Sequence, residues 1–296
     1  MCYTQNRFKA LLSACVLSLI ATAGWSQSLT WLGTLGGNRS EAFGVSANGA
    51  VVVGVAYNAA GQLRAFRWTA SGGMMEDLGT LGGDESAAYG VSANGAVVVG
   101  VANNAAGQQR AFRWENGVLQ DLGTLPGGRE SGAPGVSADG RVVVGWAINA
   151  AGQRRAFRWQ NGGMQDLGTL PGGSWSCAYG VSADGRVVVG YARDAAGREY
   201  AVRWTASGGM QNLGTLPGGG NSWAIAVSAD GSVVVGVAWN AAQQLRAVRW
   251  TASGGIQDLG TLLGGSNWTW ASGVSADGSV VVGWAKNAAG PERAFR

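Results

Sequence analysis

The feature that most constrains the fold is an internal repeat. The runs LGTL and VVVG each occur six times, and the pair Arg-Trp ends a third run five times. Successive copies are 44 to 47 residues apart throughout the chain. A repeat of about 20 to 50 residues is typical of arrays in which each copy is one supersecondary unit. The sequence therefore predicts six similar units, which start near Leu32, Leu78, Leu122, Leu167, Leu213 and Leu259.

Each unit is expected to contain four short strands. In residues 176–216, Asp184-Gly185 separates two extended runs, and this pair predicts a type I′ hairpin turn, which needs φ > 0 at both residues. The VVVG run does not alternate between apolar and polar residues, so both faces of its strand should be buried. The runs that end at Trp204 and Leu216 provide the third and fourth strands. We expect no helix beyond the N-terminal apolar stretch, because no later segment has an apolar period of about 3.6 residues.

A single four-stranded meander leaves two apolar faces exposed, and radial stacking of such sheets covers both. We therefore expect an all-β fold, a β-propeller with six four-stranded blades. A parallel β-helix would fit the period, but two-residue turns cannot join parallel strands. Leu29–Leu35 resembles a fourth strand without a unit of its own, whereas the last unit lacks one. We expect this N-terminal strand to complete the last blade; a chain cut after Arg296, with more blades to follow, is the alternative.

The N-terminus has the layout of a secretory signal peptide. Arg7 and Lys9 precede an apolar stretch, and Ala21 and Ala23 form a small-x-small cleavage site. We expect residues 1–23 to be the signal and residues 24–296 the six-repeat propeller domain. Lipidation at Cys15 is the alternative, although this cysteine lies in the middle of the apolar run. The predicted location is the periplasm, the cell surface or the extracellular medium, without an integral membrane segment in the mature chain.

Composition argues against several classes of function. The chain has no histidine, so the usual general base and the usual metal ligand are absent. Without residues 1–23 the 21 basic residues become 19, against 17 acidic ones, and no basic patch indicates nucleic-acid binding. Cys177 would then be the single cysteine, which excludes an internal disulfide. We expect a monomer that is not an enzyme, with no cofactor and no metal site.

Two recurring charged positions are interpreted as structural. Arg67 recurs once per unit on the third strand, and Asp77 recurs on the fourth, which predicts an ion pair between adjacent strands. A ring of arginines that binds an anion is the alternative. The turn aspartates, such as Asp184, are attributed to turn chemistry, because one carboxylate per unit does not form a calcium loop. The sequence supports no catalytic pairing among the remaining acids, which include Glu85, Glu130 and Asp194.

Tryptophan gives the clearest functional signal. Five of the fourteen tryptophans belong to the repeat, but others are irregular and gather in the connections of the last three units. In a propeller these connections lie on one face, where exposed indoles would stack on a sugar or pack against a protein loop. The alternative is that they fill space between blades. The candidate ligand-binding residues are Trp175, Trp223, Trp239, Trp268 and Trp270.

The combination of LGTL-Gly-Gly, GVSADG and VVVG over residues 29–296 resembles the HAF family of extracellular repeats. Arg64-Ala65-Phe66 and its copies stand where that family has His-Ala-Phe. The block V-S-A-D-G-x-V-V-V-G is also similar to the S-P-D-G strand pair of bacterial TolB-type propellers. The resemblance implies propeller-like tandem repeats in exported proteins, some of them similar to autotransporter passengers, and it implies no catalytic role.

These observations favour a non-catalytic scaffold that binds carbohydrate or an envelope or surface protein through its tryptophan-rich face. A second hypothesis is a structural passenger or a fragment of a longer autotransporter-like surface protein. A third is a propeller glycosidase or lyase, which the missing histidine and the scarcity of unit-specific acids argue against.

Overall fold

The computed structural model describes residues 29–262, 268–286 and 290–296. The predicted signal peptide lies outside these ranges. The chain divides into Met1–Trp31 and Leu32–Arg296, and all strands of the described residues lie in the second unit. No helix that could cross a membrane is found in the described ranges.

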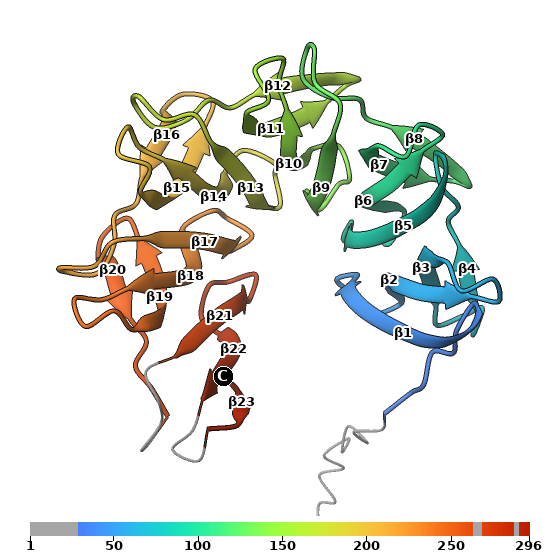
Figure 1. Cartoon of the computed structure of the whole chain (residues 1–296). Coiled ribbons are helices and arrows are strands. Elements are labelled where there is room, and N and C mark those ends of the chain that lie inside the picture. The colour runs from blue at the N-terminus through green and yellow to red at the C-terminus, as the bar shows by residue number, and fades with distance from the viewer. Residues whose placement is uncertain (1–28, 263–267, 287–289) are drawn as a thin grey trace, which may run out of the picture. The chain divides into compact units, whose positions relative to one another are not determined.

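The second unit is a six-bladed β-propeller, as the repeat predicted. Its blades are antiparallel meanders that follow one another in chain order, with the first strand of each blade innermost (Figure 1). Blades 1 and 2 comprise β1 (Gly36–Val45), β2 (Val51–Asn58), β3 (Leu63–Thr69), β4 (Met75–Asp77), β5 (Gly82–Val91), β6 (Val97–Asn104), β7 (Gln109–Glu115) and β8 (Val118–Asp121). Blades 3 and 4 comprise β9 (Ser131–Val136), β10 (Val143–Ile148), β11 (Arg154–Gln160), β12 (Gly163–Asp166), β13 (Ser176–Val181), β14 (Val188–Arg193), β15 (Glu199–Thr205) and β16 (Gly209–Asn212). Blades 5 and 6 comprise β17 (Ser222–Val227), β18 (Val233–Trp239), β19 (Leu245–Thr251), β20 (Gly255–Asp258), β21 (Thr269–Val274), β22 (Val281–Lys286) and β23 (Glu292–Phe295).

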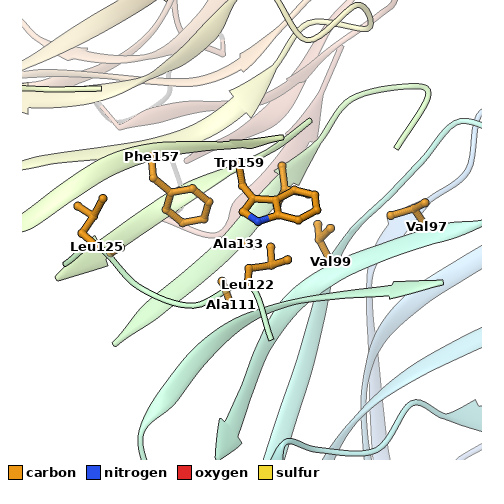
Figure 2. Close-up of a cluster of buried hydrophobic side chains, with 10 residues drawn as sticks. Val97, Val99, Ala111, Leu122, Leu125, Ala133, Phe157 and Trp159 are labelled. Atoms are coloured by element: carbon orange, nitrogen blue, oxygen red, sulfur yellow. The ribbon is translucent and has the colours of Figure 1, made fainter. Parts of the chain in front are cut away.

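The hydrophobic core lies between consecutive blades. In the cluster shown in Figure 2, Val97 and Val99 of blade 2 belong to the same buried group as Phe157 and Trp159 of blade 3. Burial of one Val or Phe side chain contributes roughly 1.5–3 kcal/mol. The VVVG strand is buried on both faces, as predicted: Val97, Val98 and Val99 are at most 1% exposed. Each sheet is therefore stabilised mainly by its neighbours.

A buried hydroxyl joins each blade from the second onward to the blade before it. Ser176 on β13 accepts a hydrogen bond from the N–H of Ala156 on β11 at 2.9 Å. Its Oγ donates to the carbonyl of Gly168, in the connection between the blades, at 2.6 Å. We call this arrangement the serine latch. The equivalent residues that accept the same amide hydrogen bond are Ser86, Ser131, Ser222 and Thr269.

The Asp-Gly hairpins differ from the predicted type I′ turn. Gly140 has φ 74°, but Asp139 is not among the residues with positive φ. The N–H of Gly140 bonds to the carbonyl of Ser137, and the Asp139 carboxylate accepts from the Ser137 hydroxyl at 2.6 Å. The side chain thus holds the aspartate in an ordinary turn that needs only glycine in the left-handed region. Two consecutive residues with positive φ do occur at another hairpin, Asn116-Gly117, with φ values of 51° and 80°.

The prediction that the N-terminal strand completes the last blade is wrong for the described residues. The sixth sheet contains three strands, and Leu35 instead forms a parallel bridge with Asn58 in blade 1. Leu81 makes the same bridge to Asn104, so this end of the LGTL run is fixed by the blade that follows it. Val282 in blade 6 is 45% exposed, whereas its counterpart Val144 in blade 3 is buried in a cluster with Ala178 and Val188 of the following blade.

Candidate binding site

The five predicted tryptophans lie near one end of the blades. Trp175 and Trp268 directly precede the innermost strands β13 and β21. Trp223 and Trp270 are the second residues of β17 and β21, and Trp239 ends β18. The antiparallel meander brings the start of each first strand beside the end of the second strand. The structure therefore gathers these residues at the same end of blades 4 to 6.

Three ring contacts place four of the five predicted tryptophans in two separate groups. The rings of Trp223 and Trp270 are 6.3 Å apart, and Trp270 stacks at 6.3 Å on Trp284 of the neighbouring strand. Trp239 and Trp268 form a second, edge-to-face pair at 5.9 Å. Each group contains a tryptophan of blade 5 in contact with one of blade 6, so part of this aromatic surface does fill space between blades.

A pocket opens beside the first group. It has a volume of about 540 Å³, and four aromatic rings line it together with Ile225, Pro134 and Glu199. The aromatic residues are Tyr179, Tyr191, Trp223 and Trp270. Of the five predicted site residues only Trp223 and Trp270 line it; Trp175, Trp239 and Trp268 do not. We call this site the aromatic pocket.

Glu199 is the single carboxylate of the aromatic pocket. Its Oε2 accepts a hydrogen bond from Nε1 of Trp223 at 2.7 Å. Its Oε1 is bound by Arg193 at 2.8 Å, and this ion pair compensates the charge of the side chain. The carboxylate therefore fixes the Trp223 indole and leaves the pocket without an uncompensated negative charge.

Two tyrosines provide polar groups in the same pocket. The hydroxyl of Tyr191 accepts a hydrogen bond from Nε1 of Trp175 at 3.1 Å. Burial raises the pKa of Tyr191, and burial together with the neighbouring Cys177 and Tyr191 raises the pKa of Tyr179. Both phenols therefore remain protonated at physiological pH and can act as hydrogen-bond donors to a ligand.

Tyr179, Tyr191 and Glu199 were not predicted from the sequence, which singled out tryptophan alone. The signal that could have found them is the loss of repetition at aligned positions. Tyr191 stands where blade 1 has Val55, and Glu199 stands where it has Leu63. Such differences between otherwise equivalent strands mark the surface that is particular to blades 4 to 6.

The recurring Arg–Asp pair is present with a different arginine. Asp121 lies opposite Phe112, so it shares a face with Arg110, two residues before Phe112, and not with Arg113. Arg110 binds Asp121 at 3.2 Å, and Arg113 instead donates to the carbonyl of Gly140 in the next blade. The partner is thus the arginine that precedes Ala-Phe in the third strand, and the assignment to the Arg67 series was wrong.

The remaining acidic candidates have structural roles or lie elsewhere. Asp194 accepts the N–H groups of Ala196 and Arg198 and so closes the β14–β15 hairpin. Neither Glu85 nor Glu130 lines the aromatic pocket. Within the described part of the chain no three acidic or cysteine side chains are grouped as metal ligands would be.

The architecture defines the fold class of the protein: it is a β-propeller. The chain is similar to a putative TolB from Agrobacterium tumefaciens, with 17% identity and a TM-score of 0.55, over 87% of this chain and 91% of that one. For TolB from Acinetobacter baumannii the identity is 15% and the TM-score 0.52, over 74% of this chain; the match spans about half of that protein, 53% of its length. The propeller domain of the Trilobed protease from Pyrococcus furiosus shares 10% identity, with a TM-score of 0.55, over 87% and 80% of the two chains. These similarities establish the fold.

No family model matches the sequence, and no curated protein matches it.

Proposed function

We propose that the protein is an exported, non-catalytic propeller that binds carbohydrate in the aromatic pocket. The observation that carries this proposal is the pocket itself, about 540 Å³ lined by four aromatic rings and few polar groups. Ligand sites are typically concave and mostly apolar, with a small number of polar groups that fix orientation. The apolar face of a sugar ring can pack on an indole, and its hydroxyls can bond to the phenols of Tyr179 and Tyr191.

The polar groups of the pocket support binding more than hydrolysis. A glycosidase of the usual kind needs two carboxyl groups on opposite sides of the scissile bond. The aromatic pocket contains only Glu199, and both of its oxygens already have partners in Trp223 and Arg193. These contacts suit a residue that positions an indole.

The export of the protein is part of the proposal. It is supported by the predicted signal in residues 1–23 and by the resemblance to extracellular HAF repeats. A propeller in the envelope or outside the cell would meet glycans and surface proteins. The pocket favours the sugar, because its concave aromatic surface fits a ring better than a flat protein surface.

A glycan array, followed by titration of tryptophan fluorescence, tests the proposal. Trp223→Ala should weaken binding of any glycan found by about tenfold or more, as expected for a central aromatic contact. Phe43→Ala is the matched control, since Phe43 occupies the position of Tyr179 in blade 1 and is 47% exposed. Trp268→Ala changes only the second tryptophan group, which does not line the pocket, and should leave binding unchanged. Equal affinity of wild type and Trp223→Ala would overturn the proposal.

A further inference from the structure

An arginine particular to blade 3 lies beside the aromatic pocket. Arg154 begins β11, and the equivalent residues at the start of the third strand differ from blade to blade. They are Leu63, Gln109, Glu199, Leu245 and Glu292. Since the other five blades form without an arginine at this position, the repeat does not require one, and the reason for Arg154 must be local.

Two indoles hold the Arg154 guanidinium. Its central carbon lies 4.0 Å from the ring centroid of Trp146 and 5.2 Å from that of Trp175. Such cation–π contacts orient the planar group and leave its N–H edge free for hydrogen bonds. The guanidinium is therefore positioned before any ligand arrives.

The backbone next to Trp146 is shaped for this stack. The residue opposite Trp146 on β9 is Gly132, and a Cβ atom at that position would lie 2.8 Å from Nε1 of the indole. The same position holds Trp223 in blade 5, opposite Val237. The missing side chain in blade 3 lets Trp146 lie close to the strand, where it stacks against Arg154.

The charge of Arg154 has no partner in the described part of the chain. Arg193, by contrast, is bound to Glu199 at 2.8 Å, and Arg155, the next residue, is bound to Asp166 at 3.2 Å. No hydrogen bond or ion pair joins Arg154 to a described residue. Its Nε is buried without an acceptor, as are those of Arg64, Arg203 and Arg249, and the two indoles beside its guanidinium distinguish Arg154 from these. A rigid, partly buried and uncompensated guanidinium favours an anionic ligand.

One aromatic residue connects Arg154 to the pocket. Trp175 contacts the guanidinium and donates its Nε1–H to the hydroxyl of Tyr191, which lines the pocket. We infer that the ligand is an acidic glycan: one sugar ring stacks in the aromatic pocket and the carboxylate of a uronic acid residue binds Arg154. This inference rests on the proposed function and specifies its ligand. The planar fork of arginine matches the planar carboxylate with two parallel hydrogen bonds.

Matched pairs of uronate oligosaccharides and their methyl esters test the inference. The two forms have the same sugar rings, so only the charge differs. We expect the wild type to bind an acid form at least tenfold more tightly than its ester, a preference that falls as salt is raised. Arg154→Gln should lower the affinity for the acid form to that for the ester. Arg154→Lys should lose most of the preference, because an ammonium group cannot form the paired hydrogen bonds.

Arg186→Gln is the control for a general effect of charge. Arg186 is 85% exposed and lies next to the β13–β14 turn, at the other end of the blade. Unchanged circular dichroism of the Arg154 variants establishes that they fold. Equal affinity for acid and ester, a preference for sulfated sugars only, or an acid preference that survives Arg154→Gln would overturn the inference and leave the pocket proposal intact. Failure of every glycan, neutral or acidic, would overturn both.

Discussion

The serine latch should make a single buried hydroxyl important to the whole propeller. We consider Ser176→Ala, in which one oxygen atom is removed. Ser176 is fully buried and connects two separate segments of blade 3, the Ala156 N–H on β11 and the Gly168 carbonyl after β12. Its removal leaves a buried donor and a partly buried acceptor without this partner.

The expected magnitude follows from these two groups. An unsatisfied buried polar group costs roughly 1–3 kcal/mol, so the loss in the free energy of unfolding should be about 2–4 kcal/mol after some relaxation. A domain has only about 5–15 kcal/mol of stability in total. Because neighbouring repeats contribute to stability through their shared interfaces, weakening the junction of blades 3 and 4 should destabilise both.

Urea unfolding monitored by tryptophan fluorescence measures this loss. Ser176→Thr is the control suggested by the protein itself, since Thr269 accepts the equivalent N–H of Ala247 at 2.7 Å in blade 6. The threonine variant keeps the hydroxyl. Its free energy of unfolding should remain within about 1 kcal/mol of the wild-type value, and any loss comes from packing the added methyl group. If the free energy of unfolding of Ser176→Ala lay within about 0.5 kcal/mol of the wild-type value, as is usual for surface substitutions, the latch would have no energetic significance.

Two further predictions concern titration and reactivity. Hydrogen bonds from Ser228 and then from Ser232 lower the pKa of Asp230 to about 2, below its ordinary 3.8. Ionisation of Asp230 therefore favours the folded state above about pH 4, and this stabilisation disappears as the pH falls from about 4 to 2. The melting temperature of Asp230→Asn, which reproduces Asn48 and Asn94, should depend less on pH in that range; an unchanged acid dependence would contradict this assignment. Burial raises the pKa of Cys177 to about 12, so its thiol should resist alkylation at pH 8 until urea unfolds the protein, as mass spectrometry of the labelled peptide would show. Rapid labelling of this cysteine in the folded protein would be the contrary result.

The sequence was sufficient to predict most of the fold. The repeat, the glycine-containing turns and the non-alternating VVVG run together predicted four-stranded blades and a core between them. The structure confirms the core and, in five of the six described sheets, the four strands. The turn type was wrong because Ser137 and Asp139 interact through their side chains, which stabilises a turn that needs only one residue with positive φ. The predicted partner of the aspartates was wrong for a different reason: the register places Asp121 opposite Phe112, and a shift of one residue exchanges the two faces of a strand.

The candidate site was only partly predictable. Trp223 and Trp270 were found because tryptophans outside the repeat are conspicuous in the sequence. Glu199 and Arg154 were not, since a single charged residue at a strand start has no significance until the strands are aligned and its neighbours are known. The contrast between them is visible only in three dimensions: Glu199 is neutralised by Arg193, whereas Arg154 has two indoles beside it and no carboxylate among the described residues.

The division between constant and variable positions has a physical origin. Residues that join blades, such as Ser176, Ala156 and the valines of VVVG, each contact the preceding or following sheet, so a change there affects a junction that the fold needs. Positions at the start of the first and third strands and near the end of the second lie at the end of the blades that carries the candidate site, and Leu63, Arg154 and Glu199 occupy one of them in different blades. Evolution can therefore change charge and shape at these positions without loss of the propeller. For this reason the aromatic pocket and Arg154, which lie at such variable positions, are the places to test for the specificity of the protein.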